Sequence, residues 1–183
     1  MTYFSSRQLA AVALFSGLWG VLNSVFSPIV FRVFGLPILC DVIGFAVLSL
    51  TFWWVRKFGA VTVVGVVATI INFVLNPGGV FFLGFTIASL CFDLVAGLAI
   101  MNRISSRQSA TAISLTSISV LSATVAGLVI GAYFMTTEAL AAWGGVFGWA
   151  ALHALGGLIG GLIGISILAS LSTHNIQNTS LRT

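Results

Sequence analysis

Charge is what this sequence has least of. Of its 183 residues 5% are charged, with seven Lys or Arg against three Asp or Glu, whereas an ordinary soluble domain carries roughly 25%. Hydrophobic residues make up 59% of the chain, and the mean hydropathy is +1.17. These values predict an all-α, polytopic membrane protein whose helices satisfy their own backbone groups within the lipid.

Other absences exclude whole classes of function. The chain has a single lysine and no GxxxxGK[ST], HExxH or GxSxG motif, so nucleotide hydrolysis, zinc proteolysis and common serine chemistry lack their parts. No basic cluster marks an amphipathic surface, so no nucleic acid partner is expected. The histidines, His153 and His174, and the cysteines, Cys40 and Cys91, lack metal-ligand spacing. We therefore expect no metal, cofactor or catalytic residue, and we interpret the cysteines as packing residues.

Long apolar runs with short joints predict six transmembrane helices in one domain, residues 1–171. The runs cover approximately residues 8–26, 38–55, 59–75, 80–101, 110–135 and 146–171. Ser5 and Ser6 are N-cap candidates for the first helix. The polar segment 172–183 is expected to be a disordered cytoplasmic tail.

The basic residues fall almost entirely on one side of these runs. That side carries Arg7, Arg56, Lys57, Arg103, Arg107 and Arg182, and only Arg32 falls on the other. Cytoplasmic connections of membrane proteins are enriched in Lys and Arg. Both termini are therefore expected in the cytoplasm of a multi-pass cell-membrane protein, with outer connections at 27–37, 76–79 and 136–145.

The sharpest connection is Asn76-Pro77-Gly78-Gly79. Pro77 fixes its own φ and disfavours the α region for Asn76, while the two glycines permit positive φ, so the chain should reverse direction here. Asn72 and Asn76 lie beside this turn in apolar surroundings, where an unsatisfied polar group costs roughly 2–7 kcal/mol. Such groups normally have a partner or bind something.

Polar and aromatic side chains gather near the outer ends of several predicted helices. A rise of about 1.5 Å per residue brings them to a common depth. Aromatic faces with a few acids, amides and an imidazole suit a pocket for a small, flat, polar solute. The candidate substrate-binding residues are Asn23, Asp41, Asn72, Asn76, Glu138, Trp143, Trp149 and His153.

Each candidate also has a purely structural interpretation. Asp41 could pair with Arg32, and His153 could be a hydrogen-bonded core residue. The two outer tryptophans could belong to an interfacial aromatic belt, and Glu138 could be solvated. The pocket prediction depends on the shared depth of these residues.

Asp93 lies deeper, about fourteen residues below the outer turn and past the midplane. An ionisable side chain at such a depth suggests a functional site. No basic residue lies at the same depth, so the sequence leaves open a protonated carboxyl, a bond to a backbone group or a bond to Asn102. Both a transport role and helix bracing stay possible for Asp93.

Small residues recur at four-residue steps on three runs, which favours close helix packing in lipid. On the fifth and sixth runs, Ser119, Ala123, Gly127 and Gly131, and Gly156, Gly160 and Gly164 beside Gly157 and Gly161, are expected to pack within the chain. The first run has Ser16 with Gly20, and Ala13 with Gly17. The Ala13 and Gly17 face could instead meet another membrane subunit.

Three segments together resemble a known family. They are ALFSGLWGVLN at 13–23, SPIVFRVFGLP at 27–37 and NPGGVFFLGFTIASLCFDLVAGL at 76–98. With six short predicted spans, they resemble the substrate-binding S component of energy-coupling factor vitamin transporters over residues 8–171. The family's docking face usually carries two alanines four residues apart, where this chain has Ala13 and Gly17.

The resemblance implies a function. It implies a subunit that binds a vitamin or vitamin precursor from outside, with residues 27–37 as a lid. The first helix would dock to a separate transmembrane T component, which two cytoplasmic ATPases drive. Two outer acids and two outer tryptophans favour a cationic or weakly basic ring, of thiamine or hydroxymethylpyrimidine type.

Two other classes stay open from the residues themselves. A small helical membrane scaffold or assembly protein would use the glycine faces for partners and leave the outer polar residues exchangeable. An integral-membrane enzyme would have Asp93, Glu138 and His153 as its acid and base groups. Their different depths argue against one active site.

Overall fold

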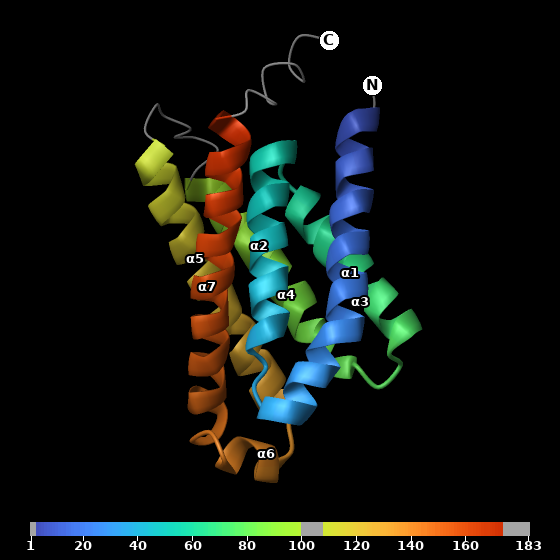
Figure 1. The fold of residues 1–183 in the computed structure, drawn as a ribbon, viewed down its shortest axis with the longest axis vertical. Helices are drawn as coiled ribbons and strands as arrows, with labels where there is room; N and C mark the ends of the chain where they lie inside the picture. The colour runs from blue at the N-terminus through green and yellow to red at the C-terminus, as the bar shows by residue number, and fades with distance from the viewer. Residues whose placement is uncertain (1–2, 100–107, 174–183) are drawn as a thin grey trace.

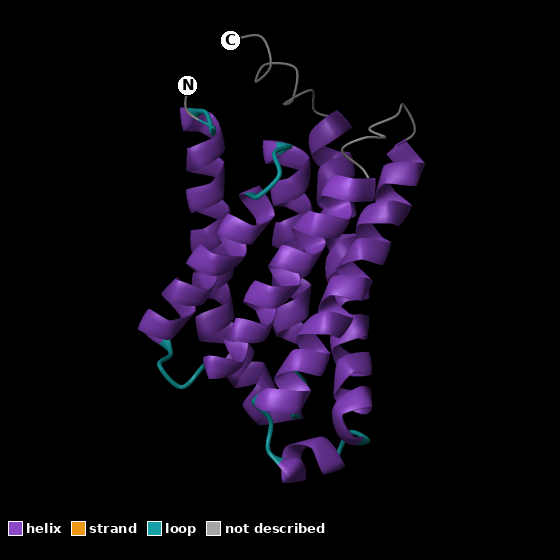
Figure 2. Cartoon of the chain, turned by 180° about the vertical axis from the view of Figure 1, so that it is seen from behind, coloured by secondary structure: helices purple, strands orange, loops and turns teal. Residues whose placement is uncertain are grey.

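The computed structural model describes residues 3–99 and 108–173, and these residues form helices and connections without strands. Short loops join consecutive helices (Figure 2), except between α4 and α5, whose connection lies outside the described residues. In chain order the elements are α1 (Ser6–Phe34), α2 (Ile38–Val55), α3 (Ala60–Leu75), the short 3-10 helix η1 (Val80–Phe82), α4 (Leu83–Ala99), α5 (Gln108–Tyr133), α6 (Thr137–Ala141) and α7 (Gly145–Thr173).

The six longer helices form a closed bundle (Figure 1). Each packs against two neighbours in the order α1, α2, α7, α5, α4, α3 and back to α1. Large buried side chains fill the interior, among them Trp19, Phe45, Phe85 and Phe92. Helix α1 begins and helix α7 ends at the same end of the bundle, which we call the terminal end. The opposite end, which carries α6, is the far end.

The predicted apolar runs coincide with helices. The second run matches α2 residue for residue, and the others differ at their ends. Within the described residues, five helices are long and apolar enough to cross a membrane: α1, α2, α4 with η1, α5 and α7. Helix α3 is also apolar, but its 16 residues span only ~24 Å at about 1.5 Å per residue, less than the roughly 30 Å of a bilayer core. Length and composition thus identify a multi-pass membrane protein.

Helix α1 departs from its predicted end. The run was expected to stop near Phe26 and to give way to a connection at 27–37, but the helix continues through Pro28 to Phe34. Gly35, with a φ of 67°, then closes it by donating its N–H to Phe31. Proline removes one backbone hydrogen bond and bends a helix, and α1 bends over its last turns (Figure 1). The expected lid is therefore a bent helical extension rather than a loop.

The other end of α1 is capped as its sequence predicts. The Ser5 hydroxyl accepts from the Gln8 N–H, and the Gln8 side chain accepts from the Ser5 N–H. Gln8 also donates to the carbonyl of Val55 at the end of α2. The sequence Ser-Ser-Arg-Gln of residues 5–8 recurs at 105–108, and residues 105–107 lie outside the described residues. So does the tail from 174 onward, while Ser172 and Thr173, assigned to the tail from sequence, end α7.

The turn at 76–79 reverses the chain, with the Gly79 N–H donating to the Asn76 carbonyl at 2.9 Å. Its glycines do not have the positive φ that the sequence suggested; the glycines with positive φ lie elsewhere in the described chain. Gly79 is required for space instead. A Cβ there would lie 2.7 Å from Asn72 Oδ1 and 3.1 Å from the Asn76 carbonyl oxygen.

The small residues of α5 and α7 pack against one another and against α2. A Cβ on Gly157 would lie 2.4 Å from the Ala123 Cβ, and one on Gly160 would lie 2.8 Å from the Asp41 carbonyl oxygen. The prediction of packing within the chain is confirmed for these faces. On α1, Gly20 packs likewise, with a Cβ position 2.8 Å from Ile71, whereas Gly17 has nothing within 4 Å.

Asp93 braces two helices at the terminal end. Its Oδ2 accepts from the backbone N–H and the hydroxyl of Thr62, at 3.0 and 2.9 Å. Thr62 lies in the first turn of α3, whose N-cap residue Gly59 supplies no side-chain cap. The fully buried carboxyl of Asp93 on α4 thus satisfies a free N–H of α3. Of the partners considered from sequence, the structure contains the backbone group, while Asn102 lies outside the described residues.

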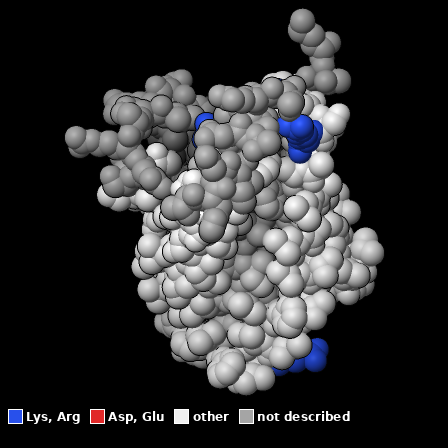
Figure 3. Space-filling view, turned by 45° about the horizontal axis from the view of Figure 1, so that its top comes forward, with Lys and Arg blue, Asp and Glu red and all other residues white. Residues whose placement is uncertain are grey.

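Basic side chains lie near the two ends of the molecule, and no charged side chain is visible between them on this face (Figure 3). Arg7 opens α1, and Arg56 and Lys57 follow α2 at the same end, where the Lys57 ammonium donates to the Tyr3 carbonyl. Arg32 lies in the last turn of α1 at the far end. Arg103, Arg107 and Arg182 lie outside the described ranges.

Candidate functional site

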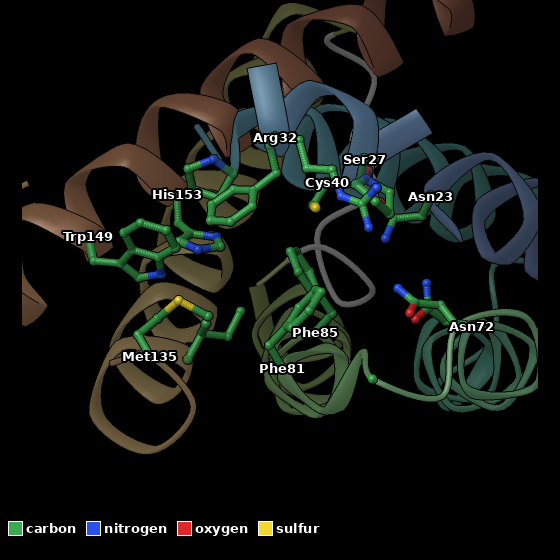
Figure 4. A pocket seen from close by; sticks show the side chains of 16 residues that line it. Asn23, Ser27, Arg32, Cys40, Asn72, Phe81, Phe85, Met135, Trp149 and His153 are labelled. Carbon is green, nitrogen blue, oxygen red and sulfur yellow. The ribbon is translucent and has the colours of Figure 1, made fainter. Parts of the chain in front are cut away.

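A cavity opens at the far end of the bundle, with a volume of about 230 Å³. Its wall includes the exposed residues Phe31, Arg32 and Gly78 and the buried residues Trp149 and His153, so it runs from the surface into the interior. Side chains from α1, α2, α3, α4, α5 and α7 point into it (Figure 4). The full lining set is Asn23, Ser27, Pro28, Phe31, Arg32, Pro37, Cys40, Asn72, Asn76, Gly78, Phe81, Phe85, Ile130, Met135, Trp149 and His153.

The predicted binding residues divide into three groups. Those that line the cavity are Asn23, Asn72, Asn76, Trp149 and His153. Asp41 lies one layer behind and touches the cavity only through His153. Glu138, exposed on α6, and Trp143, half-buried after α6, are outside the lining set. The common depth brought most of these residues together, but the two residues of the α6 connection are not among them.

Asp41 and His153 form a buried pair between α2 and α7. The imidazole Nδ1 lies 3.0 Å from Asp41 Oδ1 and 2.9 Å from Oδ2, and both side chains are almost fully buried. Gly156 allows this approach, because a Cβ there would lie 2.6 Å from the Asp41 Cβ. The alternative that Asp41 pairs with Arg32 is therefore replaced by a pair with His153.

The amides at the opposite wall are held by serines. Asn23 Oδ1 accepts from the Ser27 hydroxyl at 2.8 Å, one helical turn away on α1. Asn72 Nδ2 donates to the Ser24 oxygen at 3.2 Å and so joins α3 to α1. Both asparagines are about 1% exposed, so each amide is presented to the cavity in a fixed orientation.

Aromatic rings separate the amide wall from the histidine wall. Phe81 and Phe85 lie between them in the close view (Figure 4). The His153 ring lies 5.8 Å from both the Phe85 and the Trp149 rings, and Phe31 meets Trp149 edge to face at 6.2 Å. This arrangement offers stacking surface in the middle and hydrogen-bonding groups at both ends.

Several lining residues were not identified from sequence. Phe81 and Phe85 could have been predicted, because residues four apart lie on the same face of a helix and both follow the turn at 76–79. Cys40 was interpreted as a packing residue, and its buried thiol does pack in the core but also lines the cavity. Ser27 and Met135 had no signal, since their position depends on the bend of α1 and on the end of α5.

Three buried side-chain atoms of the cavity lining have no hydrogen-bond partner among the described protein groups. They are Asn72 Oδ1, Trp149 Nε1 and His153 Nε2. Buried polar groups in folded proteins are nearly always paired, by the protein, by water or by a ligand. Three of the seven such atoms in the described residues surround this one cavity, which makes it the candidate binding site.

The residues considered for an enzyme are far apart in the fold. Asp93 is bonded to Thr62 at the terminal end, Glu138 is exposed on α6 and His153 lies in the cavity wall. Asp93, Glu138 and His153 therefore do not form one acid–base site. Within residues 3–99 and 108–173, no three His, Cys, Asp or Glu side chains gather as a metal site would require.

Comparison with known proteins gives no match for this chain among protein-family models, curated proteins or solved structures.

Proposed function

We propose that this chain is the substrate-capture subunit of an ATP-driven uptake transporter for a vitamin or vitamin precursor. It binds a small heterocyclic solute from outside the cell and docks to a separate transmembrane T component with two cytoplasmic ATPases. The observation that carries this proposal is the far-end cavity, where unpaired polar atoms of α3 and α7 surround aromatic rings.

The proposed topology has six crossings with both termini in the cytoplasm. Arg7, Arg56 and Lys57 cluster at the terminal end, and cytoplasmic ends of membrane proteins are rich in such residues. The cavity then faces the outside. The short helix α3 crosses with its ends near the interface, where the bilayer thins or flanking residues adapt at modest cost.

The cavity volume supports the smaller of the two expected solutes. A cavity of ~150 Å³ holds benzene in an engineered protein, so about 230 Å³ suits one ring with a few substituents. A hydroxymethylpyrimidine fits this description, whereas thiamine adds a second ring. The acids that suggested a cationic ring do not line the cavity, so a positive charge on the solute is not needed.

The proposed docking face is the stripe of Ala13 and Gly17 on α1. Ala13 is exposed, and a Cβ on Gly17 would meet nothing within 4 Å, so this stripe is not used for packing inside the chain. Small residues let another helix approach closely and gain van der Waals contact in lipid. This face is therefore available to a transmembrane partner.

Calorimetry on the purified protein tests the proposal. Titration with a panel of vitamins and precursors, without ATP, should give tight binding of one single-ring compound. The changes Trp149→Ala and His153→Ala should abolish this binding while the protein stays helical. Flat titrations across the panel, together with no co-purifying compound, would contradict the proposal.

The second candidate is a helical scaffold without a solute, which the outward small-residue face of α1 favours. A scaffold would keep its partner when Trp149 or His153 is changed and would lose it when Gly17 is enlarged. Pull-down of partners with both kinds of variant distinguishes the two candidates. Binding of a solute by the isolated chain excludes the scaffold.

A further inference from the structure

The unpaired atoms of the cavity have determined hydrogen-bonding roles. Trp149 Nε1 carries a hydrogen and can only donate. The roles of the other two, on His153 and Asn72, follow from the bonds that their side chains already make.

His153 presents an acceptor. Its Nδ1 lies within hydrogen-bond distance of the Asp41 carboxylate, which can only accept, so the proton is on Nδ1. In the neutral imidazole the other nitrogen, Nε2, then carries a lone pair. Asp41 thus acts through His153 as a positioning residue.

Asn72 also presents an acceptor. The hydroxyl of Ser24 donates to the Gly20 carbonyl, so its oxygen can only accept from the Asn72 amide. This bond requires Nδ2 to face Ser24 and leaves Oδ1 unpaired. The missing side chain of Gly79 keeps space open 2.7 Å from that oxygen.

From these roles we infer that the cavity selects a neutral, single aromatic ring with hydrogen-bond donors on two opposite edges and an acceptor beside one of them. One donor of the solute bonds to Asn72 Oδ1 and the other to His153 Nε2. The solute's acceptor receives the Trp149 N–H, and its ring stacks on Phe81 and Phe85. Amino-substituted pyrimidines with a hydroxyl or second amino group have this pattern. The inference rests on the proposed function and specifies its substrate class.

A carboxylate-bearing ring is the competing class, because Arg32 lines the cavity. Arg32 is exposed, however, and an exposed ion pair contributes a factor of about five at most. A carboxylate offers only acceptors, so it would leave Asn72 or His153 unpaired in a buried wall. Each such unpaired group weakens binding by roughly tenfold to a hundredfold.

Three related probes test the inference by calorimetry. They are 4-amino-5-hydroxymethyl-2-methylpyrimidine, its 4-dimethylamino analogue, and the analogue with a carboxylate in place of the hydroxymethyl group. The first should bind tightest, and each analogue should bind about ten to a hundred times more weakly. Equal or tighter binding of the carboxylate analogue would overturn the inference.

Variants test which atoms recognise the ring. His153→Asn keeps an N–H near the position of Nδ1 for Asp41 but has no atom at Nε2, and Trp149→Phe removes one donor. Both should weaken binding of the first probe at least tenfold. Trp19→Phe and Ser122→Ala are matched controls, because they remove buried unpaired atoms outside the cavity lining, and they should change affinity less than twofold. An equal loss in the controls would overturn the inference.

Measuring the dimethylamino analogue on the variants shows which edge of the solute ring faces His153 and which faces Asn72. The penalty for the dimethylamino analogue should vanish either in His153→Asn or in Asn72→Leu, whichever lacks the acceptor that meets the amino group. A penalty that persists in both variants would overturn the inference. If no pyrimidine binds but another vitamin does, the inference fails and the proposed function stands; if nothing in the panel binds, both fail.

Discussion

The carboxyl of Asp41 and the imidazole of His153 meet although 112 residues separate them in the chain. Both are buried between α2 and α7, where a polar group without a hydrogen-bond partner is costly. The pair therefore has two consequences at the scale of single residues. It stabilises the packing of two helices, and it fixes which ring nitrogen of His153 faces the cavity.

Removing the carboxyl should destabilise the protein. We expect Asp41→Ala to lower the free energy of unfolding by about 1–3 kcal/mol, because the Nδ1–H of His153 is left buried without an acceptor. Glu138→Ala is the matched control, since Glu138 is exposed, and it should change stability by less than about 0.5 kcal/mol. Thermal unfolding in detergent measures both, and equal midpoints would contradict the structural role of the pair.

At this scale the sequence predicts the depth of a polar residue along its helix better than it predicts the residue's hydrogen-bond partner. Depth along apolar runs was enough to bring Asn23, Asn72 and His153 to one cavity, because helix rise is constant. It could not identify the Asp41 partner, since that depends on which helices are neighbours in the ring. Glu138 was placed at the right end, but the short helix α6 keeps it exposed rather than in the cavity wall.

At the scale of elements, Asp93 shows how one helix can cap another. Helix α3 begins after Gly59, which has no side chain to cap it, and the carboxyl from α4 takes that place. The depth of Asp93 suggested a functional site, whereas its bonds to Thr62 indicate helix bracing.

Loss of this cap should weaken the start of α3. Asp93→Ala should cost about 1–2 kcal/mol and increase hydrogen exchange at Thr62 and its neighbours. Asp93→Asn keeps an oxygen that accepts from both Thr62 groups, so it should retain most of the stability. Exchange that is unchanged in the alanine variant would show that the cap is dispensable.

The glycine faces also differ at this scale. Gly157→Ala should destabilise the bundle by roughly 1–3 kcal/mol, because the new methyl would lie 2.4 Å from the Ala123 Cβ and 2.8 Å from the Ser119 carbonyl oxygen. Gly17→Ala on the outward stripe should change stability by less than about 0.5 kcal/mol. Unfolding in detergent compares the two variants, and similar losses would mean that Gly17 packs inside the chain.

The elements themselves were largely readable from sequence, because long apolar runs require helices in lipid. The end of α1 was not, since Ser27, Pro28 and the later Pro37 indicated a connection. A proline removes one hydrogen bond, and the helix tolerates that loss as a bend before Gly35 ends it. The end of α1 is therefore not set by Pro28 alone.

For the whole molecule, the proposed orientation can be measured directly. After Cys40 and Cys91 are replaced by Ala, a cysteine introduced at Glu138 should react with a membrane-impermeant maleimide on intact cells. One introduced at Lys57 should react only after the membrane is permeabilised. The reverse pattern would place the cavity on the cytoplasmic side and contradict the proposed capture from outside.

A change on the outward stripe should reduce uptake by cells without changing solute binding by the isolated chain. Gly17→Leu adds bulk to the outward stripe, so it should leave solute binding by the isolated chain unchanged but reduce uptake at least tenfold in cells that contain the partners. Gly17→Ala should have a smaller effect. Unchanged uptake in the leucine variant would show that the partner docks elsewhere.

Helix α1 runs unbroken from the outward stripe of Ala13 and Gly17 to the cavity residues Ser27 and Arg32. The proposed partner would contact the stripe and the proposed solute would contact the cavity wall, so both would bind to the same helix. Thermodynamic linkage makes such effects reciprocal. If partner binding lowers the affinity for the solute by some factor, solute binding lowers the affinity for the partner by the same factor. Release of the proposed solute and a change in the contact with the proposed partner would then be coupled through α1.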